Sequence, residues 1–154
     1  MIDPPEIADA EAQRAAVLRI TIPRAEMTKV MGPAYGELMA AVTAQGIAVT
    51  GPWYSRHFRM DPDIFDFEIG VPVASAVVPA GRVAPGELPG GRVARTVFRG
   101  NYPGLGAAWG EFTRWIEAEG LAVREDLWER YVLGPEADRD PAAWRTELNR
   151  PLAG

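Results

Sequence analysis

The chain has 154 residues with 47% apolar and 24% charged side chains, which is the size and composition of one globular domain. Its 16 basic and 21 acidic residues give a net charge of −5, which is unfavourable for binding nucleic acid or anionic lipid. The absence of Cys excludes disulfides, cysteine nucleophiles and Cys-ligated zinc, and a single His makes His-based sites unfavourable. Any chemistry is therefore expected from carboxylates, hydroxyls and aromatic rings.

The N-terminal segment, residues 1–15, is polar and acidic and lacks the apolar core of a signal peptide. We expect it to be a leader, with the domain proper at residues 16–154. No run of 18 apolar residues occurs, so the sequence predicts no membrane span and a cytoplasmic protein. No helix-turn-helix segment is expected before Val17.

The first half of the domain predicts one strand, one helix and two further strands. Residues 17–22 alternate and are rich in β-branched side chains, which favours a strand. Residues 33–45 predict a helix that has a proline in its first turn and ends at Gly46. Two strands, 53–60 and 64–71, follow on either side of a tight turn.

The second half repeats this order after a connection, residues 74–90, that is rich in Pro, Gly and Ala. We expect a strand at 91–98, a helix from Tyr102 or Pro103 to Glu119, and strands at 126–133 and 143–148. One face of the predicted helix carries the apolar residues Leu105, Ala108, Trp109, Phe112 and Ile116.

The two halves also match residue by residue. A shift of 74 positions places Gly36, Ala44 and Gly46 on Gly110, Ala118 and Gly120. After one inserted residue the match pairs Trp53-Tyr54 with Trp128-Glu129, and later Glu68–Val73 with Glu147–Leu152. These matches predict a duplicated unit of about 75 residues, at about 16–73 and 91–152.

Two β-α-β-β units in tandem predict an α+β fold with helices on one face of the sheet. The other face would form a central ligand groove near the pseudo-twofold axis, because ligands often bind at such seams.

Glu129 and Tyr131 are the strongest candidates for a site. Alternation along the predicted strand puts both on one face, beside apolar residues. A carboxylate among aromatic rings can attract an organic cation, and each ring adds about 0.5–2 kcal/mol of cation–π energy. Partly desolvated, the same carboxylate could act as a general acid or base. The alternative is a solvent-facing glutamate on an edge strand.

The duplication adds further candidates. It pairs Glu129 with Tyr54, so Trp53 or Tyr54 is expected opposite the acid. Glu147 and Glu68 are equivalent, and either could be a second acid or a solvated partner of an arginine. We expect His57, the lone histidine, to be structural or exposed.

The chain resembles the GyrI-like effector-binding domain family, whose module is also fused to DNA-binding regions in AraC-type and MerR-type multidrug-responsive regulators. The matching segments are Gly51-Pro52-Trp53-Tyr54, Glu68–Val73, Arg99-Gly100-Asn101-Tyr102, Trp128-Glu129-Arg130-Tyr131 and Thr146–Leu152. The resemblance implies two repeated units around a ligand groove, with Glu129 meeting the ligand and Tyr131 beside it.

The resemblance also implies the function. The leading hypothesis is a stand-alone protein that binds lipophilic, often cationic, small molecules. The alternatives are a hydrolase of cyclopropane-containing toxins, with Glu129 and Tyr131 as catalytic residues, and a modulator of DNA gyrase. We expect no metal, cofactor, membrane or direct nucleic-acid partner. The predicted ligand-binding residues are Glu129, Tyr131, Trp53, Tyr54, Tyr102, Trp109 and Glu147.

Overall fold

The computed structural model describes residues 2–135 and 137–153, apart from the side chains of Thr28 and Met60, and shows an α+β protein. The described chain forms two compact units. The central unit is Glu11–Gly90, and the terminal unit contains the residues before and after it.

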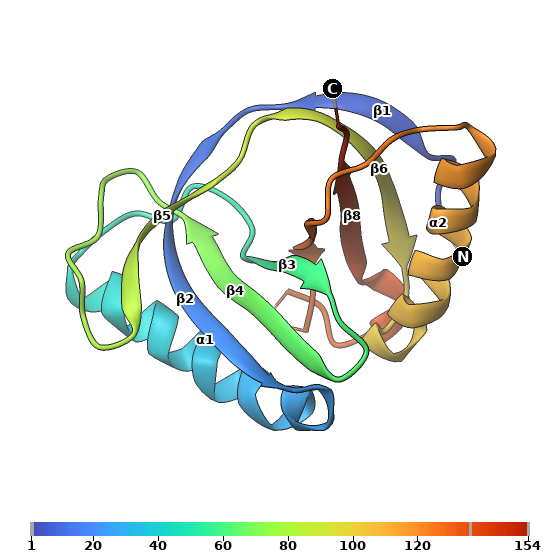
Figure 1. Cartoon of the computed structure of the whole chain (residues 1–154). Coiled ribbons are helices and arrows are strands. Elements are labelled where there is room, and N and C mark those ends of the chain that lie inside the picture. The colour runs from blue at the N-terminus through green and yellow to red at the C-terminus, as the bar shows by residue number, and fades with distance from the viewer. Residues whose placement is uncertain (1, 136, 154) are drawn as a thin grey trace. The chain divides into compact units, whose positions relative to one another are not determined.

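The central unit is a four-stranded antiparallel sheet with one long helix along it (Figure 1). The strands lie in the order β3-β4-β2-β5. The elements are β2 (Gln13–Pro23), a 3-10 turn (Arg24–Glu26), α1 (Met27–Ala44), β3 (Tyr54–Met60), β4 (Ile64–Pro72) and β5 (Val83–Leu88).

The helix α1 begins at Met27, so the prediction that it starts at Pro33 is wrong. A proline is favoured in the first turn of a helix, where its missing N–H costs no intrahelical hydrogen bond. For this reason the sequence predicts a start at Pro33, six residues after the observed start at Met27. In the structure Pro33 lies inside the helix. Ala34, Leu38 and Val42 are buried in the core after the proline, and Met27 and Met31 pack on the same core before it, so the apolar face stabilises the helix on both sides of Pro33.

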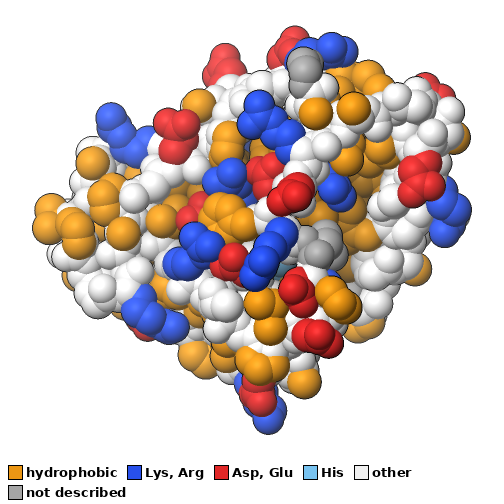
Figure 2. Space-filling view, in the orientation of Figure 1, with side chains coloured by type: hydrophobic (Ala, Val, Ile, Leu, Met, Phe, Trp, Pro, Cys, Tyr) orange, Lys and Arg blue, Asp and Glu red, His pale blue; other side chains and the backbone are white. Residues whose placement is uncertain are grey.

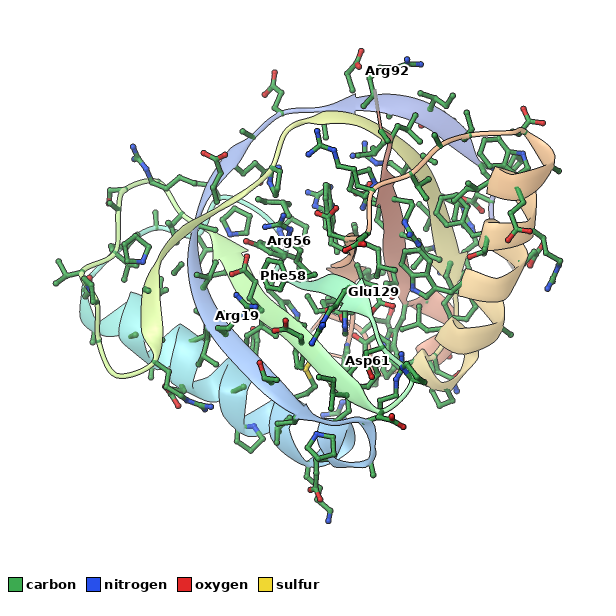
Figure 3. All side chains as sticks on the ribbon, in the orientation of Figure 1. Arg19, Arg56, Phe58, Asp61, Arg92 and Glu129 are labelled. Atoms are coloured by element: carbon green, nitrogen blue, oxygen red, sulfur yellow. The ribbon has the colours of Figure 1, made fainter. Side chains whose placement is uncertain are left out.

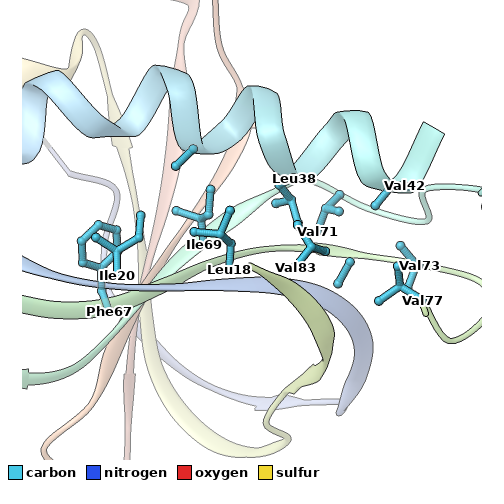
Figure 4. Close-up of a cluster of buried hydrophobic side chains, with 12 residues drawn as sticks. Leu18, Ile20, Leu38, Val42, Phe67, Ile69, Val71, Val73, Val77 and Val83 are labelled. Atoms are coloured by element: carbon cyan, nitrogen blue, oxygen red, sulfur yellow. The ribbon is translucent and has the colours of Figure 1, made fainter. Parts of the chain in front are cut away.

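Apolar side chains from α1 and the sheet form the core of the central unit (Figure 4). Leu38 and Phe67 are fully buried there. The ring of Phe67 stacks on that of His57, with the ring centroids 5.0 Å apart. The labelled members of this cluster are Leu18, Ile20, Leu38, Val42, Phe67, Ile69, Val71, Val73, Val77 and Val83.

His57 is buried, which agrees with a structural role, and burial lowers its pKa from 6.5 to about 4, with Arg24 adding to the effect. The unfolded chain therefore takes up the proton more readily, and stability is lost as the pH falls from 6.5 towards 4. We expect the free energy of unfolding to fall by about 3 kcal/mol over this range.

Chemical denaturation at pH 7 and pH 5 measures the loss, and NMR titration of the single histidine measures its pKa directly. His57→Leu should remove most of the difference between pH 7 and pH 5. An unchanged pH dependence in this variant would assign the loss to carboxylates.

The terminal unit has the same architecture, with strands in the order β1-β6-β8-β7 and every adjacent pair antiparallel. Helix α2 packs against β6 (Figure 1). The elements are β1 (Glu6–Ala10), β6 (Gly91–Arg99), two 3-10 turns (Tyr102–Gly104 and Pro141–Ala143), α2 (Leu105–Ala118), β7 (Leu127–Leu133) and β8 (Arg145–Pro151).

Strands β1 and β5 lie in segments that the sequence predicts as leader and connection. β1 leads into β2 but pairs with β6, whereas β5 leads into β6 but pairs with β2. Each compact unit therefore takes an edge strand from the segment that leads into the other sequence repeat. The prediction missed both strands because edge strands are short and carry polar residues or proline, as β1 (EIADA) and β5 (VAPGEL) do.

The duplication is visible in the equivalent packing of the two units. The buried helix residues Leu38 and Phe112 stand 74 positions apart. So do the glycines that end the helices, Gly46 and Gly120, which have φ values of 65° and 67°. Both have the positive φ that favours glycine after a helix, which confirms the predicted C-caps.

The strand register corrects the sequence alignment of the two repeats. Arg56 pairs with Glu68 as Arg130 pairs with Glu147, and Tyr54 and Trp128 occupy equivalent positions two residues earlier. The predicted one-residue insertion is therefore wrong. A shift of one residue exchanges the two faces of a strand, so the match of Tyr54 with Glu129 placed residues from opposite faces together.

Acidic and basic side chains are interspersed on the face that Figure 2 draws, instead of forming a surface of one sign. Within the units, ion pairs join opposite charges, as between Arg19 and Asp66 at 2.8 Å and between Arg82 and Glu37 at 2.9 Å. Such exposed pairs contribute little to stability. None of the helices in the described ranges is both long and apolar enough to cross a bilayer.

Candidate functional site

The candidate site is centred on the carboxylate of Glu129, on β7 of the terminal unit. The indole Nε1–H of Trp109, on α2, donates to Glu129 Oε2 at 2.7 Å. The hydroxyl of Tyr131 donates to Glu129 Oε1 at 2.8 Å. The structure thus brings together three of the predicted site residues, with each carboxylate oxygen held by an aromatic side chain.

Glu129 and Tyr131 share one face of β7, as strand alternation predicts, and this face is the one that α2 covers. Glu129 lies opposite Leu148, which belongs to the hydrophobic cluster under α2. The sequence predicts the site on the helix-free face instead. Alternation shows which residues share a face, but only the packing of α2 decides which face is covered.

Two further aromatic rings border this site. The ring of Tyr102 meets that of Tyr131 edge-on, with the centroids 5.8 Å apart. On its other side Tyr102 lies 5.0 Å from Trp144, in a tilted arrangement. A glycine, Gly104, allows the 3-10 turn that carries Tyr102 to approach the sheet, because a Cβ there would lie 2.6 Å from the ring of Phe98. Tyr102 therefore lies beside Tyr131, and its contact with a ligand stays a prediction.

Glu129 is a partly buried acid that is not paired with a basic side chain in the described part of the chain. Among the residues that the structure describes, none of the arginines or lysines forms an ion pair with it, and its hydrogen bonds come from Trp109 and Tyr131. Burial raises the pKa of Glu129, and the bonds from Trp109 and Tyr131 oppose this by favouring the ionised form. A cation that enters this site would therefore meet a carboxylate that is not paired with a basic side chain of the described residues.

The structure does not bring Glu147 to Glu129. Glu147 lies on the opposite face of the terminal sheet, where it accepts a hydrogen bond from Arg130 at 2.9 Å and lies 3.4 Å from Arg95. The equivalent acid of the central unit, Glu68, lies 3.9 Å from Arg56. Both acids therefore pair with arginines, in agreement with the alternative prediction. Unlike that prediction, their side chains are largely buried and not solvated.

Trp53 and Tyr54 belong to the central unit. Trp53 packs on the core under α1, with its ring 4.6 Å from that of Tyr35. Tyr54 is fully buried on the helix-free face, with its ring directly over Gly70. Burial, followed by the charge of Glu68, raises the pKa of the Tyr54 hydroxyl. Their contact with a ligand stays a prediction, as does the groove predicted between the repeats.

Figure 3 labels Glu129 and, in the central unit, Arg19, Arg56 and Phe58. The guanidinium groups of Arg19 and Arg56 lie 4.1 and 4.8 Å from the centroid of the Phe58 ring. Arg19 also pairs with Asp66, and Arg56 with Glu68. The central unit thus uses its helix-free face for arginine–carboxylate pairs around an aromatic ring.

Two residues of the Glu129 face were missed by the sequence analysis, Trp144 and Thr146. Both stand in the predicted strand 143–148, and their spacing from Leu148 follows the same alternation that selected Glu129. Strand alternation therefore indicated Trp144 and Thr146, but the candidate acid Glu147 belongs to the opposite face of the same strand. Among the described residues, the structure shows no group of three His, Cys, Asp or Glu side chains that could hold a metal ion.

Known structures share this fold. The C-terminal domain of EcmrR superposes with a TM-score of 0.83 at 21% identity, over 97% of each chain. The present chain spans 57% of the longer EcmrR chain that is seen in a complex with DNA. SAV2435 bound to tetraphenylphosphonium gives a TM-score of 0.73 at 12% identity, over 99% of this chain and 95% of that one.

A hydrolase from Listeria innocua gives a TM-score of 0.61 at 12% identity, over 97% of this chain and 91% of that one. At these identities the likeness establishes the fold alone. No curated protein sequence matches the chain significantly. The family profile of the GyrI-like small molecule binding domain, however, matches residues 3–153. The chain is therefore a small-molecule-binding domain that belongs to the GyrI-like family.

Proposed function

We propose that this domain binds lipophilic, often cationic, small molecules through Glu129 and the aromatic side chains around it. The observation that carries the proposal is the carboxylate itself, which is partly buried, bonded by Trp109 and Tyr131, and not paired with a basic side chain among the described residues. A buried, uncompensated charge costs free energy, so its retention in this place favours a role in binding.

The chemistry of the surroundings selects the ligand class. The carboxylate favours a cation, and each aromatic ring that contacts the cation adds about 0.5–2 kcal/mol of cation–π energy. Trp109, Tyr131, Tyr102 and Trp144 offer aromatic surface within the same unit. A flat or multi-ring cation can use both kinds of interaction, and a small inorganic cation can use only the first.

Tetraphenylphosphonium is a suitable first probe, because it is an aromatic cation and a protein of the same fold binds it. We expect it to change the fluorescence of Trp109, and isothermal titration calorimetry should show saturable binding to one site. The neutral analogue tetraphenylmethane matches its shape without the charge. Equal binding of the two compounds, or no binding of either, would contradict the proposal.

A second candidate function is hydrolysis of a strained, cyclopropane-containing electrophile at the same site. Two observations favour it: Tyr131 donates its hydroxyl hydrogen to Glu129, and burial raises the pKa of Glu129 towards the range of a general base. Glu129 would take a proton from water while the water oxygen bonds to a ring carbon. The ring carbon–carbon bond would break, and its electron pair would pass to the conjugated acceptor group of the ligand, which a proton then neutralises.

Mass spectrometry tests this activity with cyclopropane-bearing alkylators. Turnover should add the mass of one water to the compound, and Glu129→Gln should abolish it. Rates equal to those in buffer across several such compounds would leave binding as the function.

A further inference from the structure

Thr146, on the Glu129 face, has a buried hydroxyl without a hydrogen-bond partner among the described residues. It is on β8, directly opposite Tyr131 on one side and Phe98 on the other. Its side chain is fully buried, and its Oγ1 makes no hydrogen bond with any described residue. An unpaired buried hydroxyl costs stability, so its presence requires an explanation.

The other buried threonine of this face shows the ordinary arrangement. Thr96, on β6, donates its hydroxyl hydrogen to the carbonyl oxygen of Asp3 at 2.6 Å. A threonine in this layer can therefore be satisfied by the backbone. Thr146 has no comparable contact, although it lies at the centre of the sheet row formed with Phe98 and Tyr131.

The central unit has an aromatic residue at the equivalent position. The row equivalent to Phe98, Thr146 and Tyr131 there consists of Ile20, Phe67 and His57. Phe67 is fully buried and stacks on His57. An apolar ring thus fills the equivalent position of the central unit, whereas a threonine occupies it in the unit that holds Glu129.

We propose that Thr146 is a specificity-determining residue that contacts the bound molecule and exchanges a hydrogen bond with it. The inference rests on the proposed function, because it uses the same site. Glu129 selects the charge of the ligand. The hydroxyl of Thr146 can donate or accept, so it favours ligands that also carry an amine, ether or carbonyl group.

The test compares Thr146→Val with the wild-type chain, because valine keeps the shape and removes the hydroxyl. Two probes are titrated: tetraphenylphosphonium, which has no hydrogen-bonding group, and ethidium, a planar cation with two aryl amines. Thr146→Val should weaken ethidium about 3- to 10-fold and leave tetraphenylphosphonium within about twofold. Equal losses for both probes, or no loss for ethidium, would overturn the proposal.

Thermal unfolding without ligand gives an independent reading of the same residue. Removal of an unpaired hydroxyl should leave the Tm of Thr146→Val equal or higher, whereas Thr96→Val, which loses the bond to Asp3, should lower it by about 2–10 °C. A lowered Tm for Thr146→Val would show that its hydroxyl is structural and would overturn the proposal. If the wild-type chain binds neither probe, the proposed function fails, and the Tm comparison still decides whether the hydroxyl is unpaired.

Discussion

Glu129→Gln is expected to weaken the binding of tetraphenylphosphonium at pH 7 by about 10- to 100-fold, since each factor of ten corresponds to about 1.4 kcal/mol of charge attraction. The substitution removes the charge and little else. A glutamine amide can accept the N–H of Trp109 and donate to the hydroxyl oxygen of Tyr131, so the two bonds to position 129 can persist.

The pH dependence of this affinity follows from the same group. A cation binds the ionised carboxylate, so its affinity for the wild-type chain should rise as the pH increases through the pKa of Glu129, which burial raises above 4.5. Calorimetry between pH 4 and pH 8 measures this rise. Glu129→Gln should show a flat profile over the same range.

Stability should change in the opposite direction. Because the pKa of Glu129 is raised, its ionisation destabilises the folded state, and its contribution to stability is lost as the pH rises through the folded pKa. Glu129→Gln should therefore have a higher Tm than the wild-type chain at pH 7, with the difference vanishing below pH 4. Glu117→Gln, at an exposed position on α2, is the matched control and should change neither the Tm nor the affinity for tetraphenylphosphonium. Wild-type affinity in Glu129→Gln would disprove the charge role.

Phe112→Ala is expected to lower the free energy of unfolding by about 3–5 kcal/mol, because the ring is fully buried between α2 and the sheet. It lies 5.7 Å from the ring of Trp109 and 6.3 Å from that of Trp115. The cavity would loosen the helix that carries the indole donor to Glu129. Denaturant titration should show the loss of stability, and tetraphenylphosphonium binding should weaken even at temperatures where the variant is folded.

The duplication supplies the control for this prediction. Leu38 is the fully buried equivalent of Phe112, on α1 of the central unit. Leu38→Ala should cost about 2–5 kcal/mol and leave the affinity of the folded protein unchanged. Equal losses of affinity in both variants would show that binding depends on global stability and not on the position of α2.

Much of the secondary structure follows from the sequence because its signals are local. Alternating apolar residues predict β4 and β6 at nearly their observed places and the later part of β2, which begins at Gln13 inside the predicted leader. The glycines after the helices mark both helix ends. The start of α1 differs because burial of its apolar face outweighs the preference of Pro33 for a first turn. Strands β1 and β5 escape prediction because they are short edge strands that carry polar residues or proline.

The sequence also indicated the duplication and Glu129, but it did not give the correct alignment of the strands of the two repeats. In the helices, the sequence alignment of the repeats correctly pairs Leu38 with Phe112, and both are fully buried. In the strands, only the hydrogen-bonded pairs Arg56–Glu68 and Arg130–Glu147 decide the alignment, since a one-residue shift changes the face and barely alters the similarity score.

By itself, the sequence determined that Cys chemistry is absent, that the chain is a tandem α+β duplication, and that Glu129 and Tyr131 share a strand face. Only the tertiary structure decided that α2 covers this face, that Trp109 donates to Glu129, and that the buried hydroxyl of Thr146 has no hydrogen-bond partner among the residues it describes. The physical reason is that alternation acts between neighbouring residues. The covering of a face and the satisfaction of a buried polar group depend instead on contacts between segments distant in the chain.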